Sequence, residues 1–365
     1  MMKTRKGKPG SSLISSLLTG AWRETPPPSE INAAELEQVA PLLIASGGGA
    51  LAFWKLRGSP LASTQTAADL KQVYRLYTLQ AAIHEREIER VIQLLNSEDI
   101  EPILVKGWSM ARHYPEPALR PYGDIDLFVR PEQFERAGKI FESEEGRKFF
   151  VDLHKGAEHL DEQSFESLFV RSETVKLGEV SVRVLSPEDH LRILCVHFLH
   201  HGAWRPAGLC DIALLAEAAC SNFDWDACLT QNRKRAGWII CAVGLAHQLL
   251  GADITGTPIA EAARKLPRWL VPAVMKEWEN PVSVDHVVPP PLANRLSHPF
   301  ETIKAIRRRW PPNPIQATIV MNGSFNEWPR IIFQAGNYLT RTAKFLASLP
   351  KEAFASPDSK HRDRH

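Results

Sequence analysis

The sequence predicts an α+β protein, with a central β-sheet at about residues 99–186 between two helical regions. Apolar residues recur at helical spacing before residue 98, and this spacing returns after Ser186. Between them lie short apolar runs and alternating patterns typical of strands. These changes predict a flexible segment at 1–30, an N-terminal helical region at 31–98, the sheet core at 99–186, a C-terminal helical region at 187–350 and a disordered tail at 351–365.

The first hundred residues are expected to be helical. Within the flexible segment a short amphipathic helix is predicted, because Leu13, Ile14, Leu17 and Leu18 share one face. Three prolines at 26–28 then indicate a stiff linker. The first long helix begins at a cap, Ser29 or Asn32, and ends before the glycines at 47–49, and a second pattern covers 66–95.

In the central region the spacing of apolar residues changes several times between strand-like and helical patterns. A buried strand is predicted at 103–105, and Lys106 and Gly107 end it. Further expected strands lie at 124–129, 148–154 and 174–184, the last split by a turn at Gly178, and short helices lie at 108–114 and 131–141.

The C-terminal region begins with a strong helix-start signal, since Ser186 can cap, Pro187 fits the first position and two acidic residues follow. Further helices are predicted at 208–220, 225–250, 257–277, 296–309 and 327–347, with a proline-rich connection at 281–291.

Composition excludes several classes of protein. Hydrophobic residues make up 44% and charged residues 24% of 365, as in soluble globular proteins, and 44 basic against 42 acidic residues leave a net charge of +2. A nucleic-acid partner is therefore not expected. No apolar run approaches the ~18 residues that indicate a membrane span. Five cysteines without a CxxC pair predict reduced core thiols in a cytoplasmic protein.

The strongest chemical signal is the pair Asp124 and Asp126. Residues two apart on a strand project from one face, so the two carboxylates lie close together and repel each other unless a cation such as Mg²⁺ binds. Two such ions can align an attacking hydroxyl with a leaving pyrophosphate. Taken alone, such a pair is more often a solvated strand end.

Neighbouring residues extend this pattern. Asp152 lies on the next predicted strand and is the best candidate for a third carboxylate ligand, with His154 on the same face. Gly107 allows a phosphate to approach the backbone closely, while Lys106 and Ser109 offer a charge and a hydroxyl.

Three segments carry a family resemblance. ILVKGWSMARHYPEPALRPYGDIDLFV, VDLHKG and VRVLSPEDHLRILCVHFLHHGAWR resemble the uncharacterised nucleotidyltransferase family of the DNA polymerase β-like superfamily, over roughly residues 36–250. The resemblance implies a mixed β-sheet nucleotidyltransferase core with helical flanks. Asp124 and Asp126 match the metal-binding pair and Asp152 the later carboxylate. Lys106, Gly107 and Arg120 match the KG motif and the arginine before DID.

The expected activity is transfer of a nucleoside monophosphate from a nucleoside triphosphate, with ATP as the expected nucleotide, to a hydroxyl acceptor. Pyrophosphate is released, and the acceptor is a small molecule, a saccharide or a peptide. Asp124, Asp126 and Asp152 are assigned to Mg²⁺ or Mn²⁺, and Asp152 also to general-base catalysis. The cofactor-binding residues are Lys106, Gly107, Ser109 and Arg120.

Two alternatives remain open. In the first, the protein is a catalytically inactive accessory of a biosynthetic assembly that binds a nucleotide or a partner. Its partner proteins would then come from the same biosynthetic gene cluster. A departure from the wider superfamily supports this alternative. The usual pattern has Gly-Gly or Gly-Ser shortly before the aspartates, whereas here Trp108 follows Gly107 and the gap to Asp124 is long. In the second, it is a toxin-like transferase that acts on RNA or protein.

Three further features have competing interpretations. His190, His197, His200 and His201 either pack within a helix or help to close the site, and a zinc site is disfavoured. Asp211 is predicted to contact a neighbouring arginine or the ligand, or else to serve as an ordinary capping or ion-pair residue. The basic run at 307–309, followed by Trp310, favours a solvated face over a phosphate-binding patch.

Overall fold

A five-stranded sheet forms the centre of the part of the chain that the computed structural model describes, residues 8–157, 161–219, 222–279 and 311–354. The strand order is β3-β2-β1-β5-β4. The pairs β2·β3 and β1·β5 are parallel, and β1·β2 and β4·β5 are antiparallel, so the sheet is mixed as predicted. The strands are β1 (Ile103–Leu104), β2 (Ile125–Val129), β3 (Val151–Lys155), β4 (Glu173–Leu177) and β5 (Val180–Val184).

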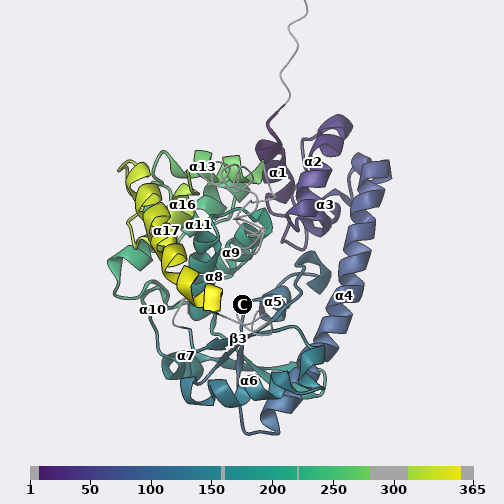
Figure 1. Ribbon diagram of the computed structural model, residues 1–365. Coiled ribbons are helices and arrows are strands. Elements are labelled where there is room, and N and C mark those ends of the chain that lie inside the picture. The colour runs from purple at the N-terminus through teal and green to yellow at the C-terminus, as the bar shows by residue number, and fades with distance from the viewer. Residues whose placement is uncertain (1–7, 158–160, 220–221, 280–310, 355–365) are drawn as a thin grey trace, which may run out of the picture.

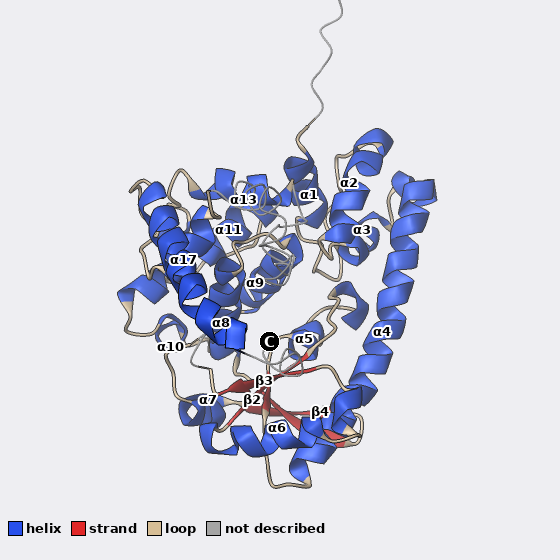
Figure 2. Ribbon diagram, viewed as in Figure 1, coloured by secondary structure: helices blue, strands red, loops and turns tan. Residues whose placement is uncertain are grey.

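Each face of the sheet is covered by different helices (Figure 2). On one face, apolar strand residues such as Leu127 pack with the second half of α4 (Gln65–Asn96) and with α6 (Phe134–Glu142). On the other, Phe128 packs with α7 (Phe165–Arg171) and α8 (Pro187–His200). Because side chains alternate along a strand, even-numbered residues of β2 face α8.

The N-terminal helices form part of the larger core. They are α1 (Gly10–Leu18), α2 (Ala33–Ala45), α3 (Gly49–Leu56) and α4, and α2 begins with a capping box between Asn32 and Glu35. The sequence indicated a flexible segment before residue 30, with one short helix. In the structure that helix is α1, and its face of Leu13, Ile14, Leu17 and Leu18 is completely buried. Burial of this apolar face accounts for the order of the segment.

The remaining helices stack above the sheet in the view of Figure 1, and α4 runs along one side past both regions. They are α8, α9 (Pro206–Ala218), α10 (Trp225–Leu229), α11 (Arg233–Leu250), α12 (Ala260–Ala263), α13 (Leu270–Trp278), α16 (Pro314–Val320) and α17 (Ile331–Phe354). Short helical segments lie in the connections between these elements. They are η1 (Pro60–Ser63) between α3 and α4, α5 (Gly107–Ala111) and η2 (Pro117–Leu119) between β1 and β2, and η3 (Pro131–Gln133) and η4 (Gly146–Lys148) on either side of α6.

Several predicted helices differ from the structure, and the one expected at 257–277 is split into α12 and α13 by the non-helical residues 264–269. The helix expected at 225–250 is broken between α10 and α11, where Thr230 has a φ of +59° and Asn232 caps α11 by accepting hydrogen bonds from the Lys234 and Arg235 amides. At the C-terminus α17 continues to Phe354, four residues into the expected tail. The predicted helix at 296–309, the proline-rich connection, the basic run with Trp310 and the tail from 355 lie outside the described residues.

A buried ion cluster ties α8 to the chain that follows β3. The Arg192 side chain, 0% exposed, donates hydrogen bonds to Asp161 at 2.8 and 2.6 Å, to Asp189 at 2.6 Å and to the Ala227 carbonyl at 2.8 Å. Arg171, whose side chain is 36% exposed, also pairs with Asp189. Two guanidinium groups and two carboxylates therefore balance in charge.

The prediction of buried thiols holds for the cysteines that the structure describes. Cys195, Cys210, Cys228 and Cys241 are free and buried, while Cys220 lies outside the described part. None of the described helices combines the length and the apolar composition that crossing a bilayer requires.

Candidate functional site

Two carboxylates meet where β2 and β3 run side by side. The parallel register places Asp126 opposite Asp152, and His154 follows two residues later on the same face of β3. One ligand atom from each of these three side chains lies within 4.8 Å of the others. The group faces α8, since the Phe128 ring, on the α8 side of β2, lies edge-on to the His154 ring with centroids 5.6 Å apart.

Positive charge gathers on this group. The Lys106 ammonium forms an ion pair with Asp126, and both side chains are almost fully buried. His154 Nε2 lies 3.1 Å from Asp152 Oδ2 and 3.5 Å from Asp126 Oδ1. Burial alone would lower the pKa of His154, but the hydrogen bonds to Asp126 and Asp152 raise it to about 9. At neutral pH two cationic groups therefore neutralise the two carboxylates.

The loop that carries Lys106 has an unusual backbone. Lys106 has a φ of +53°, which is uncommon for any residue other than glycine, and Gly107 follows with +30°. The Ser109 hydroxyl, fully buried, donates a hydrogen bond of 2.8 Å to the Lys106 carbonyl. In this structure Ser109 therefore stabilises the backbone of the Lys106 loop.

Arg120 joins this loop to the helical region. Its guanidinium donates to the Gly107 carbonyl at 3.3 Å and to both carboxylate oxygens of Asp211 on α9, at 3.0 and 3.3 Å. The buried Tyr114 hydroxyl donates to the same carboxylate at 2.7 Å. Burial lowers the pKa of Arg120, but the charge and hydrogen bonds of Asp211, together with the nearby Tyr114 and Asp126, raise it overall. Asp211 thus contacts an arginine, one of the two contacts expected for it.

Asp124 lies beside the group and not within it. Among the described residues the cluster of potential ligands comprises Asp126, Asp152 and His154. Asp124 is partly buried, and its carbonyl oxygen lies close to Gly107. Burial and the charge of Arg120 lower the pKa of Arg205, while the charge of Asp124 raises it, so this carboxylate lies within electrostatic reach of the helical region.

The histidines of α8 pack behind the site. Burial lowers the pKa of His197 well below its usual value, and the nearby Lys106 charge lowers it further. His190 is buried beside His113, with ring centroids 6.5 Å apart, and burial likewise lowers its pKa strongly. The three-residue cluster of potential ligands includes none of the α8 histidines within the described ranges. These neutral rings fill the space between α8 and the loops of the sheet.

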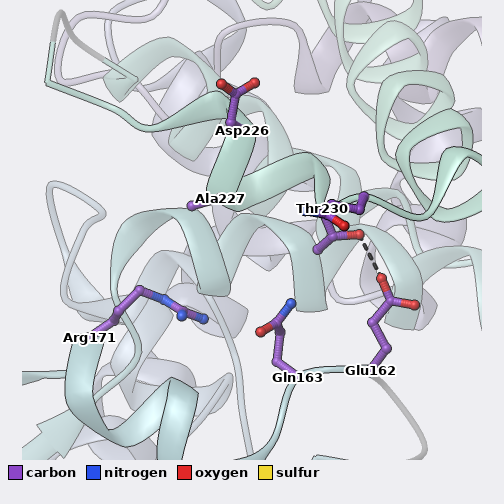
Figure 3. Close-up of a pocket in the computed structure, with 7 residues that line it drawn as sticks. Glu162, Gln163, Arg171, Asp226, Ala227 and Thr230 are labelled. Carbon is purple, nitrogen blue, oxygen red and sulfur yellow. Dashed lines mark hydrogen bonds between the residues drawn. The ribbon is translucent and has the colours of Figure 1, made fainter.

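A second hollow lies away from the carboxylates, at α10 and the end of α7. This cavity has a volume of about 480 Å³ and is lined by Glu162, Gln163, Arg171, Asp226, Ala227, Thr230 and Gln231. Figure 3 labels six of these side chains. Glu162 accepts hydrogen bonds from Thr230 at 2.7 Å and Asn232 at 2.9 Å, and Arg171 pairs with Asp189. None of the predicted site residues lines it.

The donor set of the first site fits a divalent cation. Two carboxylates suit Mg²⁺ or Mn²⁺, and an imidazole is a ligand that Mn²⁺ and other transition metals accept. The Lys106 ammonium and the His154 ring already contact these carboxylates, so a cation that binds here would displace the proton from His154.

The sequence indicated which residues lie near this site, but not which contacts they make with one another. It noted His154 on the face of Asp152 but assigned it no role, although the spacing of two on a strand was the available signal. The ion pair of Lys106 with Asp126 was missed, since it depends on a backbone conformation that the letters Lys-Gly do not specify.

Comparison with known proteins adds one finding. No curated protein matches the chain, and neither does any solved structure. A family model described as uncharacterised nucleotidyltransferase matches residues 32–251, which include the whole sheet, α8, α9 and α11. This segment covers more than half of the chain and contains every residue of the site described above. The chain therefore belongs to the uncharacterised nucleotidyltransferase family.

Proposed function

We propose that the protein is a metal-dependent nucleotidyltransferase that transfers a nucleoside monophosphate from a nucleoside triphosphate to a hydroxyl acceptor. The observation that carries this proposal is the in-register pair Asp126 and Asp152, with His154 beside them, in a chain of this family. In the proposed step the acceptor oxygen bonds to the α-phosphorus, the bond to the β-phosphate oxygen breaks, and pyrophosphate leaves.

Three residues are assigned to the cation. Asp126, Asp152 and His154 would hold Mg²⁺ or Mn²⁺, and Asp124, which directly precedes β2, is proposed as a further carboxylate for the bound cation. When bound, the cation neutralises charge on the triphosphate and on the leaving group. Asp152 is also the proposed general base, because its carboxylate is 41% exposed and accessible to an acceptor, whose proton it would take.

The loop after β1 is assigned to the triphosphate. Lys106 supplies the ammonium that would bind phosphate oxygens, and Gly107 lets the backbone approach them. Arg120 and Ser109 act through this loop, by holding the Gly107 and Lys106 carbonyls. Their contribution is therefore to position the Lys106 backbone.

The acceptor is proposed to be a small molecule, a saccharide or a peptide, with ATP as the first nucleotide to test. Four buried free thiols support a cytoplasmic setting, where nucleoside triphosphates are supplied.

The test measures pyrophosphate release and thermal stabilisation of the purified protein with ATP, GTP, CTP and UTP, each with Mg²⁺ or Mn²⁺. Metal-dependent release is expected with at least one nucleotide, to water, to the protein or to a co-purifying acceptor. The double variant Asp124→Asn, Asp126→Asn should lose more than the roughly 10- to 100-fold that outer-shell residues of metal sites already contribute. Asp226→Asn is the matched control, since Asp226 is exposed and lies at the second hollow, and it should behave as the wild type.

Two results would count against transfer. Release that persists in the double variant excludes the carboxylates as the reactive centre. Metal-dependent stabilisation by a nucleotide without release, even with candidate acceptors added, favours the binding-only alternative.

A further inference from the structure

The Lys106 side chain contacts one of the carboxylates proposed to bind the metal ion. Its ammonium is paired with Asp126, whose carboxylate belongs to the proposed cation site. The Lys106 residue is 8% exposed and Asp126 3%, so water contributes little to either charge. The ammonium thus serves as the counter-ion of a buried carboxylate.

A divalent cation and this ammonium compete for the same carboxylate. If both stay, they repel each other at short range in a site of low dielectric. If the ammonium leaves, it becomes a buried charge without a partner, which is unfavourable. Either outcome weakens the binding of a metal ion alone.

A bound triphosphate removes this conflict. Its oxygens give the ammonium a new anionic partner close to the metal, and the flexible four-carbon stem of lysine lets the charge move while the backbone stays in place. Asp126 is then free to bind the metal. The same reasoning applies in reverse, because coupling between two ligands is reciprocal.

We propose that Lys106 makes metal binding and triphosphate binding depend on each other, by moving from Asp126 to the phosphates when both ligands are present. The inference rests on the proposed function. It predicts that the two ligands bind cooperatively, by a factor in the usual range of about 5- to 150-fold.

The experiment measures each ligand alone, so that chelation of metal by phosphate in solution does not interfere. Mn²⁺ binding is followed by calorimetry without phosphate, and binding of inorganic tripolyphosphate is followed with EDTA present. In Lys106→Met, Mn²⁺ should bind about 10-fold more tightly than in the wild type, and tripolyphosphate about 10-fold more weakly. A purely structural role of Lys106 would weaken both ligands or neither.

The matched control is Lys155→Met, which removes the same charge at the end of β3. Residue 155 is exposed and lies on the opposite face of the strand from Asp152 and His154. Both affinities should stay within about twofold of the wild type, because this charge pairs with neither ligand site. Mn²⁺ binding to Lys106→Met that is unchanged or weaker overturns the inference while leaving the proposed function intact.

A second pair of variants does not alter Lys106 and so covers a failure of Lys106→Met to fold. Asp126→Asn releases the ammonium, whereas Asp152→Asn removes an equal charge from the neighbouring strand and leaves the Lys106 ion pair in place. With EDTA present, tripolyphosphate should bind at least about fivefold more tightly to Asp126→Asn than to Asp152→Asn. Equal affinities overturn the inference, and a wild type that binds neither Mn²⁺ nor tripolyphosphate overturns the proposed function as well.

Discussion

The substitution Arg192→Met tests the buried ion cluster that ties α8 to the chain after β3. Methionine keeps most of the aliphatic volume but removes the charge and all four hydrogen bonds. Asp161 Oδ2 then has no cation, although its other oxygen still accepts from the Glu162 and Gln163 amides. Asp189 keeps Arg171 as its partner.

The expected cost follows from burial. Both side chains of the Arg192 and Asp161 pair are 0% exposed, and removing one partner of such a pair costs about 3–5 kcal/mol of unfolding free energy. Arg171→Met is the matched control, because it removes the same group from the same Asp189 at a site that is 36% exposed. Solvent screens that pair, so the loss should be about 1 kcal/mol or less.

Urea unfolding followed by far-UV circular dichroism measures both losses. The m values should stay unchanged, so that the shift in midpoint reports stability. The double variant Arg192→Met, Asp161→Asn should be more stable than Arg192→Met alone, because the uncompensated charge is gone. Equal losses for Arg192→Met and Arg171→Met would refute the reasoning, since burial would then have no effect on the strength of these pairs.

Three further predictions concern stability. Burial and the Arg112 charge lower the pKa of His113 to about 4, and burial lowers that of His190 well below its usual value, so below pH 6.5 the unfolded chain takes up protons that the folded chain does not. Unfolding free energy should therefore fall as pH drops from 6.5 toward 4, by at most about 1.4 kcal/mol per pH unit for each group and less for the partly exposed His113. When unfolding free energy is measured with urea at a series of pH values, His190→Gln should show a smaller fall over this range. In Gly244→Ala, a Cβ would lie 2.3 Å from the Ala263 carbonyl oxygen, so α11 and α12 must separate, at about 1–3 kcal/mol by urea unfolding; an unchanged midpoint would show that the close approach is not required. Leu17→Ala should cost about 2–5 kcal/mol in the same assay because Leu17 is fully buried, and a loss below 1 kcal/mol would mean that α1 is not part of the core.

The sequence allowed prediction of local features where one signal dominates. The alternation around Asp126 and the helix-start signal at Ser186 both predicted the elements that are found. Long-range contacts were less accessible, because the chain between β2 and β3 does not fix their register, and the partner of Arg120 lies 91 residues away on α9. The break at Thr230 was missed, although the polar run 230–235 with Asn232 as a cap was a signal for it.

The helix α1 was predicted from its apolar face, but its place in the core was not. Its stability comes from burial against other helices, which becomes visible only when the tertiary core is assembled.

The parallel pairing of β2 with β3 has a consequence for insertions and deletions. Backbone hydrogen bonds set the separation of Asp126 and Asp152, at the ~4.8 Å spacing of neighbouring strands, so changes in apolar side chains nearby leave it intact. A slip of β3 by one residue reverses its faces and sets Leu153 or Val151 beside Asp126, whereas a slip by two can set His154 there. Tolerance to length changes between the strands should therefore depend on the parity of the resulting slip, with odd slips removing the ligand set and even ones exchanging its members.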